Sequence, residues 1–592
     1  MSESEGSGPK SPGVATRVPT LPPSARCFFG KRPIRVACTD ERVQNPAEDA
    51  NSPPRGGHRM PYSFPPHRMP LLLMSQRLLR VAGFAVLLSP LASPAQTTIA
   101  DLERAPAPVI AAGDVGADSA VLWVQANRPG TVLVELAAPN GSDAPPRQFQ
   151  LPASAESDFT VKMRVDGLMP DTTQRWRAAL ITGPEQIGDS ARGEFHTAPT
   201  PFTAARVHLA WGADLGGQNV CRDAERGFEV FDPIVASGPD LFVALGDMIY
   251  ADGLCEAVGR YGNAQVPASF GQATDLSGFR AHWRYSRADP GLRQLLANTA
   301  YYAAWDDHEV VNDFGPLQDT RADPPYRPGV HLLPLGLTAL LEQNPIGEDP
   351  LTPKRLYRSV RWGQHLELLL LDTRQYRDAN LASDSAERPK TLLGREQLTW
   401  LKQRITDSDA TWLVIASSVP LAIPTGWPPA AGRDGWANFD QQGGFEQELR
   451  AILDVAASSR RNNLVFISAD THFAAAFRYR PFTARPDFSV YELVTGPLSA
   501  AIGDTADYDR DLGTEQLFRH APASAAEVSD YAEARRWFGF GDIVIDTSGE
   551  LTATLRGVDG KPWYSLRLTP SLATRLAARG GGPWLGTRGL PD

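Results

Sequence analysis

This chain lacks an excess of positive charge. Its 58 Lys and Arg residues are outnumbered by 68 Asp and Glu residues, which gives a formal net charge of -10. Because nucleic acids attract proteins through positive charge, this composition argues against a protein held on nucleic acid by a general basic field. An extracellular nuclease would need a basic strip beside its site, and the sequence shows none. An anionic small substrate stays possible, since a bound metal ion can reverse the sign of the field in one pocket.

Long hydrophobic runs are missing as well, although a membrane-spanning helix needs ~20 apolar residues. The apolar segment 81–88 is too short for this; it follows two arginines and precedes small residues ending at Ala95. That is the layout of a secretory signal peptide over residues 74–95, and the absence of cysteine at its cleavage site argues against a lipoprotein. We therefore expect a periplasmic or secreted protein without a transmembrane segment in the mature chain. We interpret residues 1–73 as disorder or an over-long start.

Cysteine is scarce, with four in 592 residues. Cys27 and Cys38 precede the expected cleavage site, so the mature chain keeps only Cys221 and Cys255. Two cysteines in an exported protein most simply form one disulfide, and both follow predicted strand ends. A metal-ligand role for Cys221 is the alternative.

The length of the chain predicts more than one domain. Residues 101–200 consist of short segments that alternate apolar and polar residues, with Gly, Pro, Asn and Asp between them. This is typical of an antiparallel β-sandwich of the fibronectin type III kind. Residues 205–570 instead alternate buried strands with amphipathic helices, so we expect an α/β catalytic domain there and a C-terminal tail over 571–592.

The stretch Leu241–Gly253, LFVALGDMIYADG, combines a buried strand with polar side chains at its end. Its apolar half is typical of a central parallel strand, and Asp247 follows that half directly. Ligands of open α/β sheets bind at the carboxyl ends of strands. Tyr250 comes three residues later, so a tight turn could aim a carboxylate and a phenolate at one cation. An aspartate that caps a turn is the alternative.

Carboxylates recur in this position along the second domain. Capping alone explains such recurrence poorly, because clustered carboxylates are costly unless cations neutralise them. Asp, Asn, Tyr and His together suit Fe, Mn, Zn or Ca rather than a thiolate site. With one aspartate as a bridge, the pattern predicts a two-metal centre, whose usual chemistry is in-line displacement at phosphorus. The carboxylates that follow strands are Asp214, Asp247, Asp306, Asp372 and Asp470.

Several motifs resemble the PhoD-type alkaline phosphatase family, which belongs to the calcineurin-like metallophosphoesterases and is related to the purple acid phosphatases. They are GDMIYADG, WDDHEVVNDF, LLLLDTRQYRD, LLGREQLTWLKQRITDSDATWLVIASSVPL, SADTH and YELVTGPLSA. The resemblance covers about residues 108–570. It implies a four-layer α/β/β/α core, with two mixed sheets between helices, preceded by an N-terminal β-sandwich.

The same resemblance implies a set of metal ligands. Asp247 would bridge two ions, and Tyr250 and His472 would bind the first, ferric ion. Asn312 and Asp470 would hold the second ion, which is typically calcium in this family.

Three more residues receive catalytic roles from the resemblance. Asp307 and His308 stand where related phosphoesterases have an Asn-His pair, so either could bind metal or contact the phosphate. We assign His308 as a transition-state contact or proton donor to the leaving group. Arg374 is the candidate phosphate clamp, because a guanidinium matches two phosphoryl oxygens, and a salt bridge with a nearby carboxylate is the alternative.

Two features depart from the family pattern. Asp214 stands where typical members have a cysteine, so Mn, Mg or Zn become possible in addition to Fe and Ca. Family members often carry adjacent arginines for export in the folded state, whereas Arg77 and Arg80 are separated. We therefore predict export of the unfolded chain, followed by metal uptake outside the cytoplasm.

The expected reaction is attack of a metal-bound hydroxide on a phosphate ester, with His308 assisting departure of the alcohol. Substrates would be small phosphate esters or phospholipids, not a specific nucleic acid. The favoured function is a PhoD-like alkaline phosphatase, and a phosphodiesterase or phospholipase D is the alternative. A hypothesis from another class is a non-catalytic secreted binding protein, which the intact ligand set argues against.

Overall fold

The computed structural model describes most of the chain after residue 105. The expectations for residues 1–73, for the signal peptide at 74–95 and for the tail from residue 572 on lie outside the described residues. Among the helices of the described part, none has both the length and the apolar composition needed to cross a bilayer. The described residues are 106–138, 144–183, 186–315, 318–319, 327–426, 434–438, 442–504 and 507–571.

Three parallel strands form the centre of a nine-stranded sheet: β9 (Val207–Gly212), β10 (Leu241–Ala244) and β11 (Ala300–Ala303). All their residues are buried, as the apolar runs of the sequence predict. The strand order is β23-β22-β21-β9-β10-β11-β1-β2-β5. The flanking strands are β21 (Gly539–Ile545), β22 (Leu551–Gly557), β23 (Pro562–Leu568), β1 (Val109–Gly113), β2 (Ser119–Gln125) and β5 (Thr160–Asp166).

A second sheet has seven strands in the order β14-β15-β16-β17-β19-β18-β20. Its core strands β15, β16, β17 and β19 run parallel, and antiparallel strands close both edges, so this sheet is mixed. The strands are β14 (Arg358–Trp362), β15 (Leu366–Leu370), β16 (Trp412–Ala416), β17 (Leu464–Ser468), β19 (Val490–Val494), β18 (Ala474–Tyr479) and β20 (Thr514–His520).

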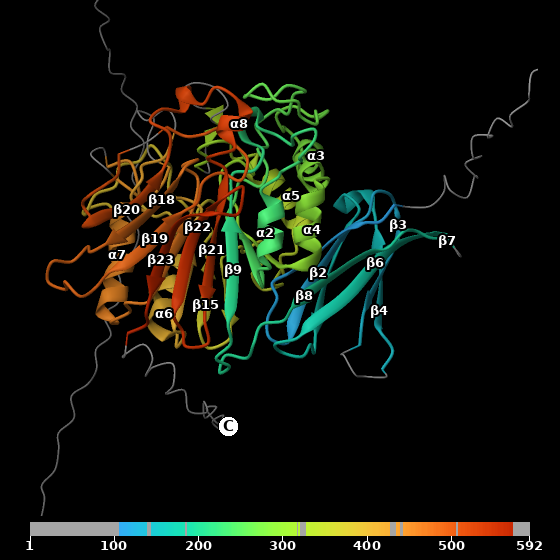
Figure 1. The fold of residues 1–592 in the computed structure, drawn as a ribbon, viewed down its shortest axis with the longest axis horizontal. Coiled ribbons are helices and arrows are strands. Elements are labelled where there is room, and N and C mark those ends of the chain that lie inside the picture. The colour runs from blue at the N-terminus through green and yellow to red at the C-terminus, as the bar shows by residue number, and fades with distance from the viewer. Residues whose placement is uncertain are drawn as a thin grey trace, which may run out of the picture. The chain divides into compact units, whose positions relative to one another are not determined.

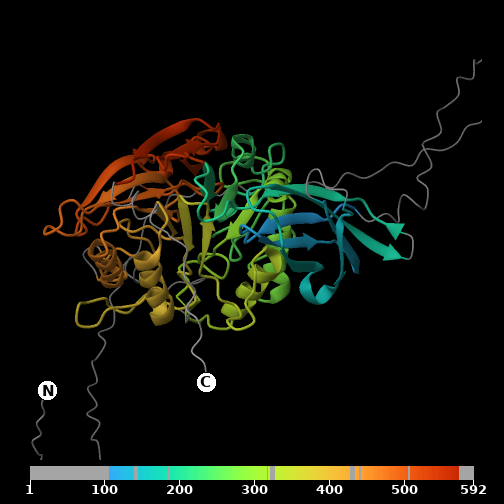
Figure 2. The ribbon, with the colours of Figure 1, turned by 90° about the horizontal axis from the view of Figure 1, so that it is seen from below.

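The two sheets pack face to face, with helices on their outer sides (Figure 1, Figure 2). Leu209 and Val243 of the nine-stranded sheet share one hydrophobic core with Leu368 and Val414 of the seven-stranded sheet. Alternate residues point to the helices, because successive side chains of a strand face opposite sides. The expected four-layer α/β/β/α core is therefore confirmed.

Each helical layer has its own hydrophobic core. Phe242 packs with Trp283 of one helical layer, and Leu413 packs with Leu401 of the other. The first layer contains α2 (Phe231–Ser237), α3 (Leu276–Arg287), α4 (Pro290–Asn298) and α5 (Leu333–Gln343), and the second contains α6 (Gly394–Asp407) and α7 (Glu446–Ser458). Shorter elements are α8 (Tyr531–Ala534), β12 (Gln318–Asp319), β13 (Arg327–Pro328) and the 3-10 helices Ala155–Ser157, Gly217–Asn219 and Ala525–Glu527.

The N-terminal β-sandwich is present, but it shares a sheet with the catalytic unit. Its outer sheet contains β3, β4, β6, β7 and β8, whereas β1, β2 and β5 continue the nine-stranded sheet through the parallel pair β1 and β11. The alternation in the sequence predicts the strands but not this pairing. The outer strands are β3 (Gly130–Leu136), β4 (Arg147–Ala153), β6 (Thr173–Gly183), β7 (Gln186–Ile187) and β8 (Ala191–His196).

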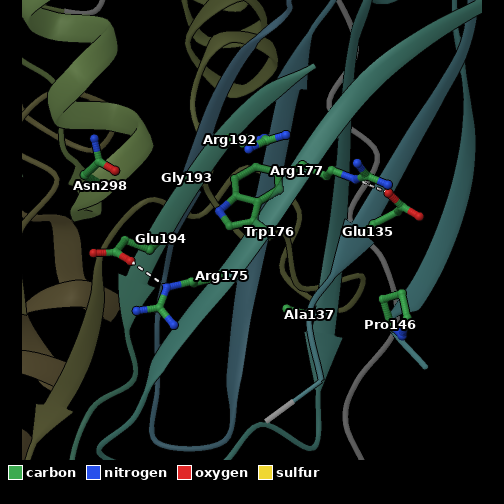
Figure 3. A pocket seen from close by; sticks show the side chains of 10 residues that line it. All are labelled: Glu135, Ala137, Pro146, Arg175, Trp176, Arg177, Arg192, Gly193, Glu194 and Asn298. Carbon is green, nitrogen blue, oxygen red and sulfur yellow. Dashed lines mark hydrogen bonds and ion pairs between the residues drawn. The ribbon is translucent and has the colours of Figure 1, made fainter. Parts of the chain in front are cut away.

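The outer sheet of the sandwich carries a cavity of about 450 Å³ (Figure 3). Glutamates neutralise two of its three arginines, since Arg175 contacts Glu194 at 3.2 Å and Arg177 contacts Glu135. No His or Asp stands among its lining residues in this described part of the sandwich. The cavity therefore lacks the residue types of the predicted metal centre.

Candidate metal centre

Strand ends from both sheets converge on one cluster of acidic and imidazole side chains. Asp247 follows β10, Asp307 and His308 follow β11, and Asp470 follows β17. Ligand atoms of Asp247, Asp307 and His308 lie within 4.8 Å of one another, and so do those of Asp306, Asp307 and Asp470. The structure therefore brings together carboxylates that are more than two hundred residues apart in the sequence.

Asp372 follows a strand but serves another purpose. It accepts hydrogen bonds from Trp305 Nε1 at 2.8 Å and from the backbone N–H groups of Arg374 and Gln375, each at 3.1 Å. This is the behaviour of a turn-capping aspartate, the alternative that the sequence leaves open for each strand end.

The ligand-bearing turns adopt a backbone conformation that is rare outside glycine. Asp214, Asp247, Asp470 and His472 have φ values of 62°, 51°, 72° and 58°. Such residues are strained and cluster at functional sites, where the surrounding structure holds them in place. Just before Asp247, Gly246 has φ 142°, and a Cβ there would meet the Asp306 backbone nitrogen at 2.4 Å. The turn after β10 thus requires glycine.

Glu309 holds two of these turns together. Its fully buried carboxylate accepts backbone hydrogen bonds from Asp247 at 3.0 Å, from Met248 at 2.8 Å and from Asp306 at 2.9 Å. Burial raises the pKa of Glu309 to about 7 although the three N–H groups favour its charged form. The sequence shows Glu309 inside an acidic cluster but gives no sign that it orders the backbone rather than binding metal.

The remaining carboxylates need a positive partner. Asp214 and Asp247 are buried and Asp470 is partly buried. Removal from water, together with repulsion by neighbouring carboxylates such as Asp306 and Asp307, raises the pKa of each well above its usual range. Both oxygens of Asp214 and one oxygen each of Asp247, Asp307 and Asp470 have no hydrogen-bond partner. Orphaned buried carboxylate oxygens are costly unless a cation binds them, so these residues fit metal ions.

One side of the cluster combines a phenol with an imidazole. His472 Nδ1 donates to the Ala501 carbonyl at 2.5 Å, which leaves Nε2 without a proton in the neutral ring. Nε2 lies 3.0 Å from the Tyr250 hydroxyl and 3.9 Å from Asp214 Oδ1. Burial lowers the pKa of His472 to about 4, so the ring is neutral at pH 7. A fixed neutral imidazole beside a phenol and a carboxylate is a ligand set suited to a transition metal.

His308 also contacts Tyr250. Its ring packs on the Tyr250 ring with 4.0 Å between centroids, and its Nδ1 lies 2.7 Å from Asp252 Oδ1. Burial opposes a charge on His308, but the carboxylates of Asp252 and Asp307 outweigh it and raise the pKa to about 10. In the absence of metal ions the ring is therefore an imidazolium, which can donate a proton.

Asp252 is a residue whose role the sequence did not reveal, although it lies inside the motif GDMIYADG. Its other oxygen accepts the backbone N–H of Asn312 at 3.0 Å, so one carboxylate orients both His308 and the turn that carries Asn312. Hydrogen bonds and the charge of His308 lower the pKa of Asp252 against the effect of burial. The only signal in the sequence was its spacing of five residues from Asp247.

Arg374 is fully buried and forms salt bridges within the protein. It lies 2.5 Å from Asp306 and 2.6 Å from Asp434, and its Nη2 is 3.7 Å from Asp307. Burial opposes its charge, but these aspartates raise the pKa of Arg374 well above its usual range. The structure thus places Arg374 in the salt-bridge alternative rather than as a free phosphate clamp. No described strand directly precedes Asp434, so the pattern of carboxylates at strand ends does not identify this residue.

The two cysteines form a disulfide, with 5.7 Å between the Cα atoms of Cys221 and Cys255. This confirms the pairing and removes Cys221 as a metal ligand. The bridge joins the segments that follow Asp214 and Asp247. Among the described residues, therefore, the centre has no thiolate available to it.

The chain matches proteins of known sequence and structure over both of its parts. A family model described as PhoD-like phosphatase matches residues 209–555, and one described as its N-terminal domain matches residues 97–199. Alkaline phosphatase D of Bacillus subtilis (strain 168) is 26% identical over 449 residues, which cover 70% of this chain and 72% of that protein.

Two solved structures show the same fold. One is described as PhoD, with a TM-score of 0.60, 21% identity and coverage of 78% of this chain and 89% of that one. The other is a purple acid phosphatase from yellow lupin seeds, with a TM-score of 0.51, 14% identity and coverage of 80% and 76%.

Proposed function

The chain belongs to the PhoD-like phosphatase family and is a phosphoric ester hydrolase, and on that premise we propose that it is an exported, metal-dependent alkaline phosphatase. The observation that carries the metal dependence is the set of buried carboxylate oxygens without hydrogen-bond partners at the carboxyl ends of β9, β10, β11 and β17. Bound ions would lower the pKa of a water molecule and neutralise charge on the phosphoryl oxygens.

The donor atoms suggest two unlike positions. Asp214, Tyr250 and His472 offer oxygen and nitrogen donors, which suit iron, manganese or zinc. Asp470 and Asn312 offer oxygens only, which suit calcium, magnesium or manganese. Asp247 is the proposed bridge between the two ions, and the resemblance favours iron with calcium.

Asp307 is a member of each cluster of candidate metal ligands that the described residues form. We propose that it binds the second ion in addition to setting the charge of His308. His308 is the proposed proton donor to the departing alcohol, because Asp252 holds Nδ1 and leaves Nε2 for the substrate. Arg260 is exposed, and its positive charge adds to burial in lowering the pKa of His472. We therefore propose Arg260, in place of Arg374, as the contact for the phosphate.

The disulfide supports export, since such bonds persist in oxidising compartments. Residues 74–95 remain the proposed signal peptide, with translocation before folding. Detection of the twin-arginine pathway as the route for this chain would contradict that order of events.

The test is hydrolysis of an aryl phosphate monoester and the matching diester by the chain from Gln96 onward, with and without a chelator. Asp247→Asn should abolish turnover. Asp240→Asn is the matched control, because Asp240 precedes the same strand at the end away from the centre and its carboxylate accepts the His208 backbone N–H at 2.7 Å.

A monoester preference that is lost with chelator supports the phosphatase, and a diester preference points instead to a phosphodiesterase or phospholipase D. Failure to turn over either ester with Fe, Ca, Mn or Zn added would overturn the proposal.

A further inference from the structure

The segment that carries Asn312 contains a strained residue and is held at several backbone groups. Asp313, the next residue, has a φ of 53°, which residues other than glycine rarely adopt unless their surroundings fix them. The backbone N–H of Asn312 donates to Asp252 at 3.0 Å. That of Asp313 donates to Asp307. The Asp313 carbonyl accepts the side-chain amide of Asn380 at 3.0 Å. Acidic residues of the centre thus hold the two N–H groups, and Asn380 holds the carbonyl.

Asn380 is itself held in one orientation. It is 5% exposed, and both ends of its planar amide are hydrogen-bonded. Besides the Asp313 carbonyl, Nδ2 donates to Asp434 Oδ1 at 2.8 Å, and Oδ1 accepts from Arg377 Nη1 at 3.1 Å. A Cβ at Gly315 would lie 2.9 Å from Asn380 Oδ1, so the amide is in close contact with the backbone that follows Asp313. An amide fixed at three points determines where the Asp313 carbonyl lies.

Asp434 anchors this arrangement from the side away from Asp313. Its Oδ1 accepts from Arg374 Nη1 at 2.8 Å and from Arg377 Nη1 at 2.5 Å, and its Oδ2 lies 2.6 Å from Arg374 Nη2. Although an oxygen of Asp434 lies within 4.8 Å of ligand atoms of two further aspartates, two guanidinium groups already neutralise its charge. We therefore interpret Asp434 as the residue that orients Asn380, not as a metal ligand.

We propose that Asn380 is a positioning residue that sets the affinity of the centre for the second ion. The inference rests on the proposed function, because it takes Asn312 as a ligand of that ion. Without the amide of Asn380, the Asp313 carbonyl loses this partner and the strained backbone can relax, so that Asn312 beside it is no longer held in one orientation. Loss of such a supporting partner typically lowers metal affinity about 10- to 100-fold. Asn380 is neutral, so unlike Arg374 or Arg377 it can be replaced without leaving a buried charge unpaired.

The test is equilibrium dialysis of the chain from Gln96 onward against graded concentrations of manganese, an ion that suits both proposed positions. Asn312→Ala identifies the second position, because one manganese equivalent should bind far more weakly. Asn380→Ala should weaken the same equivalent about 10- to 100-fold and leave the other unchanged. Asn380→Asp keeps the size of the side chain but loses the Nδ2 donor, so it should weaken that equivalent at least as much. Added to Asn312→Ala, Asn380→Ala should cause little further loss, because it acts through Asn312.

Asn463→Ala is the matched control. Asn463 is 1% exposed, its Nδ2 donates to the carbonyls of Ala410 at 3.2 Å and Thr411 at 2.8 Å, and it precedes β17 at the end away from Asp470. Both alanine variants should be less stable than the wild type in urea without metal, but Asn463→Ala should bind both manganese equivalents like the wild type. A high manganese concentration should restore aryl phosphate turnover by Asn380→Ala, since the ligands themselves are intact.

The outcomes separate this inference from the function on which it rests. A wild type that binds no manganese, or an Asn312→Ala variant that binds it like the wild type, would overturn the ligand assignment and this inference with it. Where Asn312→Ala does weaken one equivalent, wild-type binding by Asn380→Ala, an equal loss in Asn463→Ala or an additive loss in the double variant would overturn this inference alone.

Discussion

The substitution Asp252→Asn tests whether His308 is a proton donor or only a well-packed side chain. The charge of Asp252 raises the pKa of His308 more than any other group does. This pKa reaches about 10 although burial lowers it. Relative to an ordinary value of 6.5, this corresponds to about 5 kcal/mol in favour of the imidazolium. With asparagine at position 252 the largest of the contributions that raise the pKa of His308 is lost while Asp307 still raises it, so this pKa should fall.

The assay compares the pH dependence of kcat for an aryl ester and an alkyl ester. A proton donor must hold its proton, so activity is lost as the pH rises through its pKa. Bound cations lower the pKa of His308 from about 10, which puts the alkaline limb of the wild type below that pH. The variant should lose activity about two pH units lower, and its kcat for the alkyl ester should fall about 10² to 10⁴-fold at pH 8. The aryl ester, whose leaving group needs little protonation, should lose far less.

The control is His308→Asn, which should show the same dependence on the leaving group without a titrating limb. The amide side chain introduced by Asp252→Asn would keep an oxygen for the Asn312 N–H, which Asp252 now accepts at 3.0 Å, and thermal unfolding checks that the fold survives. Equal losses for both esters together with an unchanged alkaline limb would refute the role of His308 as acid.

Three other outcomes follow from buried groups. Arg374→Met should destabilise the protein by about 3 to 5 kcal/mol in urea unfolding, because it leaves buried carboxylates unpaired; a stable variant with only a raised KM would restore the clamp interpretation. Replacing Cys221 and Cys255 by serine should cost about 3 to 4 kcal/mol, since the bridge spans 34 residues, and unchanged stability in urea would contradict this. Burial and Asp509 raise the pKa of Glu446 to about 7, so wild-type stability should fall by about 1 to 2 kcal/mol between pH 4.5 and 7 as the unfolded state ionises first; Glu446→Gln should remove that slope in melting curves.

The layers and the strand ends of the fold could be predicted because each depends on local pattern. An apolar run such as Leu241–Ala244 marks a central strand, and the carboxyl ends of parallel strands must meet at one edge. This places Asp247 and Asp307, which follow the parallel strands β10 and β11 of one sheet, near each other. Asp470 follows β17 of the other sheet, so its approach to them depends on how the two sheets pack. The helices α3, α4 and α5 were not predicted, nor was the sharing of a sheet between β1 and β11, because strand pairing across nearly two hundred residues leaves no local pattern.

The residues that support the candidate metal ligands could not be predicted for a related reason. Glu309, Asp252 and Asp434 act through partners that only the folded chain brings close, and each is an ordinary acidic residue in the sequence. The sequence identifies carboxylates that follow strands, but it does not separate those that bind backbone N–H groups from those whose oxygens stay unpartnered. That separation depends on the local turn, as the contrast between Asp372, which caps its turn, and Asp247, which keeps a free oxygen, shows.

Asp214 and the disulfide are consistent with one another in physical terms. Asp214 lies on the segment that leads from β9 to Cys221, and Asp247 lies on the segment that leads from β10 to Cys255, so the bridge restrains both strained turns. Conditions that form this disulfide would also oxidise an accessible thiolate at position 214, whereas a carboxylate is inert to them. A thiolate ligand favours export of a folded protein whose metal protects the sulfur. An oxygen ligand removes that requirement, which is why Asp214 supports metal uptake after export.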